Sequence, residues 1–149
     1  MVGKPAPRTI HAPALTAMLA VLSSAILVIG VYGHLRCSVG FRDPLSTKLG
    51  AWDLDGWSLT HLAWFTLIAY VFPGRKFGVA AFIGGIVWEL IEHFLGHARP
   101  SWLGGWGDCD AAEFEKENAN WWFGRSSDII MNGLGIIAGN LLQNAKRRA

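Results

Sequence analysis

Residues 13–33, PALTAMLAVLSSAILVIGVYG, decide the fold class, because this run is apolar throughout and contains no charged side chain. A helix of 21 residues rises about 1.5 Å per residue, which is enough to cross a hydrocarbon core of roughly 30 Å. The run exceeds the roughly 7–15 apolar residues of a signal peptide, and no A-x-A cleavage site follows it. It therefore predicts an uncleaved membrane helix.

Three further apolar segments follow along the chain, at residues 57–72, 77–97 and 128–142. The first of these stops at Pro73-Gly74, a helix terminator. Residues 57–72 and 128–142 are shorter than the roughly 17 residues usually needed, so they require polar flanks, local thinning of the bilayer or shelter by neighbours. We predict an all-α fold, a single membrane domain over residues 1–149, with four transmembrane helices and outer loops at residues 34–56 and 98–125.

The composition excludes several other classes of protein. Hydrophobic residues make up 52% of the 149 residues and charged residues only 16%, with a net charge of +2. Soluble domains carry roughly a quarter charged residues, which argues against an ordinary soluble enzyme. A disordered chain and a basic nucleic-acid-binding protein are excluded on the same grounds. Two cysteines are too few for a disulfide scaffold or an all-cysteine zinc site.

The basic residues predict the orientation. With four spans, the N-terminus, the turn at residues 73–76 and the C-terminus share one side of the membrane. That side holds seven basic residues and no acid: Lys4, Arg8, Arg75, Lys76, Lys146, Arg147 and Arg148. The other side holds six basic residues in longer segments: Arg36, Arg42, Lys48, Arg99, Lys116 and Arg125. Because Lys and Arg in short loops stay cytoplasmic, we expect both termini in the cytoplasm and the larger loops outside or in a lumen.

Both cysteines fall on that outer side, Cys37 in one loop and Cys109 in the other. An oxidising exterior would permit a disulfide between them. Two free thiols fit the sequence equally well, since sequence does not give their separation.

Several ionisable residues lie within the predicted spans. Burying such a group in lipid costs roughly 2.5–3.5 kcal/mol, so these residues usually face the bundle interior and serve a function. They are His61, Glu89, Glu92, His93, His97 and Asp128, with Asn132 as a polar companion. Counted from the span ends, all of them fall in the outer half of the bundle, and they come from three separate segments. This convergence predicts an outward-facing polar pocket.

Three interpretations of the pocket compete. A site for a lipid headgroup would use Glu89 or His93 as the base, with His61 and Asp128 beside it. Phosphate would bind Arg125 and the N-terminus of the last span, where Ser126, Ser127 and Asp128 supply capping side chains. Glu92 and Asn132 would complete the ligand contacts.

A metal site formed by Glu89, Glu92, His93 and His61 is the second interpretation, since these are acceptable ligand types. The third is a neutralised polar network that only fixes the helix register. The sequence itself indicates no cofactor.

Glycines on two spans predict close helix packing. Gly135 and Gly139 form a GxxxG match on the last span, and Gly84-Gly85 would serve the same purpose on the third.

These motifs carry a resemblance to known families. Asp55-Gly-Trp-Ser-Leu-Thr-His61, Trp88-Glu89-Leu-Ile-Glu92 and Arg125-Ser-Ser-Asp128-Ile-Ile-Met-Asn132 together resemble the VanZ-like family of small multi-span bacterial membrane proteins. The chain is more similar still to an uncharacterised proteobacterial family with Cys-x-x-Gly, Ser-x-x-His and Trp-Glu-x-x-Glu motifs. The matching positions are Cys37, Gly40, Trp52, Asp55, Ser58, His61, Trp88, Glu89, Glu92 and Asp128. The resemblance implies a membrane protein with a site at these residues, and neither family supplies a known substrate.

Two functions of different classes follow from the sequence. The first is a membrane protein that binds or modifies a lipid or envelope component in the polar pocket, with membrane lipids as its partners. The second is a non-catalytic subunit that docks other membrane subunits through its tryptophan-rich outer loop. The sequence does not decide whether the protein is an enzyme.

Overall fold

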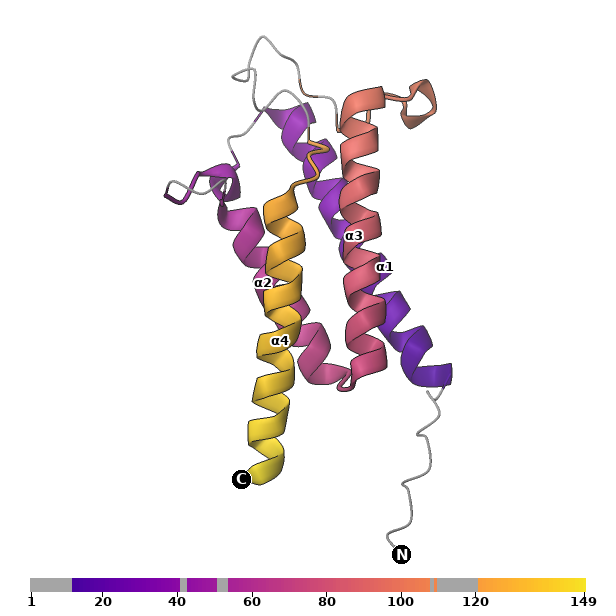
Figure 1. Ribbon diagram of the computed structural model, residues 1–149. Helices are drawn as coiled ribbons and strands as arrows, with labels where there is room; N and C mark the ends of the chain where they lie inside the picture. The colour runs from indigo at the N-terminus through magenta and orange to yellow at the C-terminus, as the bar shows by residue number, and fades with distance from the viewer. Residues whose placement is uncertain (1–11, 41–42, 51–53, 108, 110–120) are drawn as a thin grey trace, which may run out of the picture.

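The computed structural model describes residues 12–40, 43–50, 54–107, 109 and 121–149, and its fold is all-α, as predicted (Figure 1). The four helices are α1 (Ala12–Val39), α2 (Gly56–Val71), α3 (Arg75–Ala98) and α4 (Ser126–Arg148), and two 3-10 turns, η1 (Pro44–Ser46) and η2 (Ser101–Leu103), lie in the loops. Two segments, Pro13–Val39 and Arg75–Ala98, are long and apolar enough to cross a membrane.

Two helices extend well beyond the predicted spans. The first was expected to end at Gly33, but α1 continues to Val39 and takes in the start of the predicted outer loop at residues 34–56. The last was expected over residues 128–142, but α4 runs from Ser126 to Arg148. Hydropathy marks the apolar part of a helix and not its end, and no proline or glycine follows Gly139 to stop α4.

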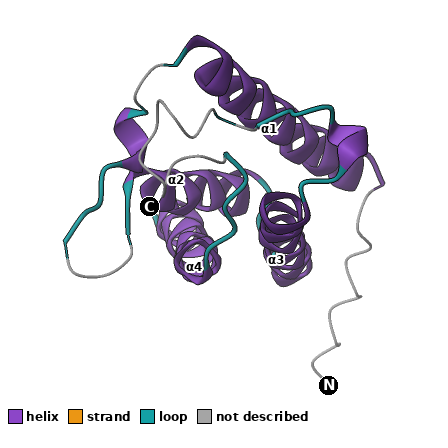
Figure 2. Cartoon of the chain, turned by 90° about the horizontal axis from the view of Figure 1, so that it is seen from above, coloured by secondary structure: helices purple, strands orange, loops and turns teal. Residues whose placement is uncertain are grey.

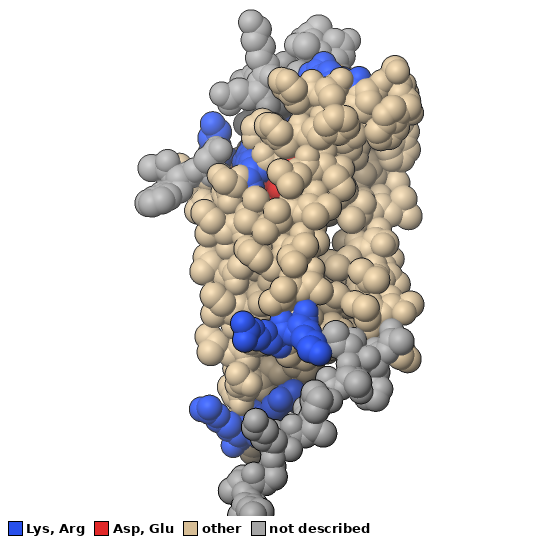
Figure 3. Space-filling model, turned by 45° about the vertical axis from the view of Figure 1, so that its right-hand side comes forward, with Lys and Arg blue, Asp and Glu red and all other residues tan. Residues whose placement is uncertain are grey.

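The chain runs up and down between two ends (Figure 1). The start of α1, the turn between α2 and α3, and the end of α4 lie at one end, and the loops that follow α1 and α3 lie at the other. Seen from above, α2, α4 and α3 form one group, with α1 lying across its side (Figure 2). On the face drawn in Figure 3, Lys and Arg gather mainly near the end that holds the termini, and most of the surface above them carries no charge.

The distribution of side chains differs from that usual in a water-soluble bundle, because many polar side chains are buried and many large apolar ones are exposed. The buried residues include eight polar or charged side chains: Arg36, Asp43, Asp55, Ser58, Glu89, Glu92, Asp128 and Asn132. Large apolar side chains such as Leu27, Leu90 and Ile130 are more than 60% exposed. Water would disfavour so large an apolar surface, whereas lipid favours it.

Helices α2 and α4 pack closely because glycines remove side chains from their interface. A Cβ at Gly135 would lie 2.6 Å from the carbonyl oxygen of Leu62, and one at Gly139 would overlap the carbonyl oxygen of Thr66. The predicted GxxxG packing is therefore confirmed. Gly85 also lies at an interface, where a Cβ would meet Asn132. The expectation for Gly84 is wrong, since a Cβ there meets nothing within 4 Å.

Helix α1 is held to the other helices near both of its ends. Near the start of α1, Met18 is buried with Phe65, Ile68 and Ala81. Nearer its end, Gly33 lies so close to Trp121 that a Cβ at Gly33 would overlap the indole ring. A disulfide joins Cys37 of α1 to Cys109, which follows α3 in the chain. Of the two alternatives that the sequence left open, the structure has the bonded one.

The two glycine environments give a matched test of the helix packing. Gly139→Ala should lower the free energy of unfolding by roughly 1–3 kcal/mol, because the added methyl forces α2 and α4 apart. Gly84→Ala should be neutral or stabilising by up to about 1 kcal/mol, since its methyl enters open space and alanine favours helix. Unfolding in detergent micelles measures both, and equal effects of the two substitutions would contradict the packing described.

Candidate functional site

Three helices bring an imidazole, two carboxylates and an amide together in the half of the bundle away from the termini. His61 comes from α2, Glu89 from α3, and Asp128 and Asn132 from α4. His61 Nδ1 lies 2.9 Å from Asn132 Oδ1 and 3.6 Å from Glu89 Oε1. His61, Glu89 and Asp128 each offer one ligand atom, and these three atoms lie within 4.8 Å of one another. The structure thus places four predicted site residues around one point.

The beginning of α2 supplies a second polar layer beside this cluster. Asp55 caps α2, and its Oδ1 accepts a hydrogen bond of 3.0 Å from the Ser58 backbone N–H. The Ser58 hydroxyl donates to Asp128 Oδ1 at 2.6 Å. Asp55 Oδ2 accepts from the Arg125 guanidinium, also at 2.6 Å. An N-capping aspartate thereby links the start of α2 to the start of α4.

Glu89 reaches the N-terminus of α4. Its Oε2 accepts a hydrogen bond of 3.0 Å from the backbone N–H of Arg125, the residue that precedes the first turn of α4. Close approach is possible because residue 124 is glycine, where a Cβ would overlap the Glu89 carbonyl oxygen. A carboxylate at this place is favoured by the helix dipole.

These contacts correct the predicted phosphate site. No side-chain hydrogen bond from Ser126, Ser127 or Asp128 caps α4, whose N-cap residue is Arg125. The Glu89 carboxylate lies where the anion was expected, and the Arg125 guanidinium is paired with Asp55. Both parts of the expected anion holder are therefore engaged by the protein's own carboxylates.

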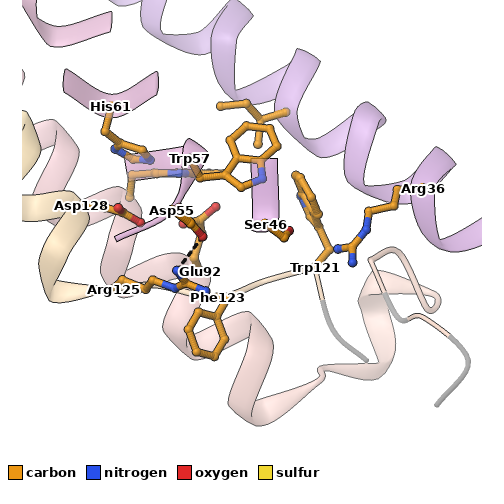
Figure 4. Close-up of a pocket in the computed structure, with 12 residues that line it drawn as sticks. Arg36, Ser46, Asp55, Trp57, His61, Glu92, Trp121, Phe123, Arg125 and Asp128 are labelled. Carbon is orange, nitrogen blue, oxygen red and sulfur yellow. Dashed lines mark hydrogen bonds and ion pairs between the residues drawn. The ribbon is translucent and has the colours of Figure 1, made fainter. Parts of the chain in front are cut away.

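A cavity of about 70 Å³ lies beside the cluster (Figure 4). His61, Asp128 and Asp55 lie together at one side of the cavity, and Trp121 and Arg36 lie at the other. The full lining is Ile29, Arg36, Ser46, Asp55, Trp57, His61, Trp88, Glu92, Trp121, Phe123, Arg125 and Asp128. A space of this size admits a few water molecules or one small chemical group.

The prediction for His93 is wrong. Its side chain is exposed, it does not line the cavity, and its ring lies against that of His97 with centroids 6.3 Å apart. On a helix with about 100° per residue, Glu92 is displaced from Glu89 toward Trp88 and the cavity, whereas His93 is displaced to the opposite side. Glu92 is buried and lines the cavity, as expected of a ligand contact.

The predicted metal set changes for the same reason. In the metal interpretation, Glu89, Glu92, His93 and His61 would have provided the ligands. Among the described residues, the group whose ligand atoms lie within 4.8 Å of one another is His61, Glu89 and Asp128. Asp128 was assigned to catalysis and not to metal binding, because sequence spacing within one helix does not reveal a ligand contributed by another.

Sequence reasoning from the residues alone missed several side chains around the cavity. Asp55, Ser58 and Trp57 entered only through the family resemblance, and Arg36 was treated as a loop charge. An aspartate followed three residues later by a serine, just before an apolar run, is a helix-start signal that could have placed Asp55 and Ser58. No sequence signal brings Arg36 to the cavity, since that depends on the six extra residues of α1. Trp52, another position of the resemblance, lies outside the described residues.

Asp43 is a buried carboxylate of a different kind, because donors satisfy it fully. It accepts hydrogen bonds from Trp57 Nε1 at 2.6 Å, Ser46 Oγ at 2.8 Å, and the Tyr32 hydroxyl and Leu45 N–H at 3.0 Å each. Burial by itself raises the pKa of Asp43, but these four donors together outweigh it and hold the pKa below its ordinary value. Asp43 therefore joins the loop after α1 to α1 and α2.

Asp43→Asn should lower the free energy of unfolding by about 2 kcal/mol near neutral pH, since hydrogen bonds to a charged group are lost. A lowered folded-state pKa gives stability that is present above the unfolded pKa of about 3.9 and lost as the pH falls through the folded value. The difference between wild type and Asp43→Asn should therefore shrink below about pH 4. Melting temperatures in detergent from pH 7 to pH 3 measure this, and a difference that grows in acid would contradict the assignment.

Comparisons with known proteins give no match: no protein-family model, no curated protein and no solved structure matches this chain. The resemblance to VanZ-like proteins stays a prediction from the motifs quoted above.

Proposed function

We propose that the protein is an integral membrane protein whose four helices hold an acid–base pocket in the outer half of the bilayer, where it binds or modifies a lipid or envelope component. The single observation that carries this proposal is the convergence of His61, Glu89 and Asp128 from three helices onto one buried point. Ionisable groups at membrane depth are costly, and they usually persist where a function requires them.

The distribution of polarity supports a membrane location for all four helices. Helix α2 has only 16 residues, and α4 ends in Lys146, Arg147 and Arg148. Hydropathy alone therefore does not identify either helix as a membrane span. Both nevertheless bury polar side chains and expose apolar ones such as Leu67 and Ile137. In this proposal both termini are cytoplasmic, and the end of the bundle that carries the Cys37–Cys109 disulfide faces an oxidising compartment.

The tryptophan side chains around the cavity support an entry at the level of the lipid headgroups. Trp57, Trp88 and Trp121 line it, and the exposed Phe123 ring lies beside the Arg125 guanidinium, whose carbon is 4.7 Å from the ring centre. Tryptophan concentrates at membrane–water interfaces because its ring has an apolar body and a polar tip. A molecule in the outer leaflet would therefore meet the cavity without crossing the membrane.

Charge favours a neutral or cationic group over a phosphate in the cavity. Four buried carboxylates, Asp55, Glu89, Glu92 and Asp128, surround the site. Arg36 and Arg125 are the arginines in the lining, and Arg125 is paired with Asp55. We therefore expect the bound group to be a hydroxyl or an amine, with the His61–Glu89 pair accepting or donating its proton.

A docking subunit is the second candidate, and the exposure of the loop after α3 favours it. Trp102 is 73% exposed and Trp106 is 39% exposed. A partner subunit could cover these rings, as could lipid headgroups. In this alternative the polar cluster only stabilises the bundle.

Two histidine variants separate these functions. Cells lacking the gene are complemented with wild type, His61→Ala or His93→Ala at equal membrane levels, and their lipids and envelope polymers are compared by mass spectrometry. His61→Ala should reproduce the composition of the deletion strain, whereas His93→Ala should restore the wild-type composition because its side chain lies outside the pocket.

Wild-type composition in the His61→Ala strain would contradict the pocket function, and so would a deletion strain without any altered lipid or polymer. Loss of function in Trp102→Ala alone would support the docking subunit.

A further inference from the structure

The three-helix cluster has the geometry of a metal site. His61 Nδ1 and Glu89 Oε1 are 3.6 Å apart. One ligand atom from each of His61, Glu89 and Asp128 lies within 4.8 Å of the other two. Two donors that each lie about 2.1 Å from a tetrahedral ion are about 3.4 Å apart, so the His61–Glu89 separation already matches the spacing of two ligands.

One oxygen of the cluster has no hydrogen-bond partner among the described residues. Glu89 is 3% exposed, and its Oε1 accepts no hydrogen bond from any residue that the structure describes. The other oxygen of the same carboxylate is engaged by the Arg125 N–H. Leaving a buried carboxylate oxygen unsatisfied costs free energy, and a cation at this point would remove the cost.

The neighbouring amide fits a cation as well. Asn132 is fully buried, and its Oδ1 lies 2.9 Å from His61 Nδ1. The contact is a hydrogen bond when the imidazole carries its proton on Nδ1, whereas both atoms are acceptors when the proton is on Nε2. In the second case, a cation that both atoms contact would offset the repulsion between them.

We propose that His61, Glu89 and Asp128, with Asn132 Oδ1 as a further ligand, bind one divalent transition-metal ion. The proposal names a cofactor for the pocket described above, and its role in activity rests on that proposed function. One imidazole nitrogen and three oxygen donors form a set suited to Zn²⁺ or Mn²⁺, and both cysteines are held in the disulfide.

The position of the cavity implies that the ion is accessible. His61 and Asp128 line the cavity and Glu89 does not, so an ion held by all three would lie at the edge of the cavity. Catalytic metal sites keep such an open position for water or substrate, whereas structural sites are closed by protein ligands. The bound hydroxyl or amine proposed above would occupy this position.

Metal binding tests the proposal without knowledge of the substrate. The full-length protein, purified in detergent with a tag that contains no histidine, is treated with a chelator and dialysed against ZnCl₂ or MnCl₂. Elemental analysis should find about one ion per chain, and the melting temperature should rise with that ion but not with MgCl₂. His61→Ala and Glu89→Gln should weaken binding at least tenfold.

His93→Ala is the matched control for His61→Ala, because it removes the same side chain about one helical turn from Glu89 but outside the ligand group. It should bind the metal as wild type does. If Glu89→Gln does not fold, Asp128→Asn replaces it, and the wild-type measurement stands by itself.

Wild type without stoichiometric binding would overturn the metal site, as would undiminished binding by folded His61→Ala. A failure here leaves the lipid comparison of the histidine variants intact. Conversely, metal binding with unchanged lipids would overturn the proposed function and keep the metal site.

Discussion

The rest of the site depends on the two contacts that the Glu89 carboxylate makes, one with each of its oxygens. One of its oxygens holds the N-terminus of α4, and the other faces His61 of α2. A single side chain of α3 thus reaches both other helices of the cluster. The position of α4 relative to α3 follows from this contact and from Gly124, which lets the chain pass close to the Glu89 backbone.

The surrounding residues shelter this carboxylate in two different ways. On the α2–α4 side, glycines bring the two backbones together, and the Ser58–Asp128 hydrogen bond is buried between the helices. On the outer side, Trp121 and Trp122 pack with Leu95 and close the bundle against α1. Asp43 and the disulfide then hold the loops over this layer. Polar groups are enclosed while the outer faces of the helices stay apolar.

Hydropathy and spacing predicted much of this arrangement. Long apolar segments predicted four helices, and the GxxxG match predicted close packing of the last helix, because both patterns act locally along one helix. The match did not identify α2 as the partner. His61, Glu89, Asp128 and Asn132 were recognised since ionisable groups in apolar segments are rare.

Most of the features that could not be predicted from the sequence depend on how one helix is oriented toward another. His93 and Glu92 are neighbours in sequence, and only the rotation of α3 decides that Glu92 lines the cavity while His93 is exposed. Arg125 pairs with Asp55, which lies 70 positions earlier in the chain. This pairing occupies the guanidinium that was expected to bind phosphate. The length of α1 was also hidden, since an apolar pattern does not show where a helix ends.

A double-mutant cycle between His61 and Glu89 tests the central claim most directly, because it measures whether α2 and α3 meet at this carboxylate. The free energy of unfolding is determined in detergent micelles for wild type, His61→Ala, Glu89→Ala and the double variant, with His93 in place of His61 as the control cycle. Contacting residues should show a coupling of about 0.5 kcal/mol or more, whereas the exposed His93 should be additive with Glu89 within about 0.5 kcal/mol. Additivity of His61 and Glu89 would contradict the account.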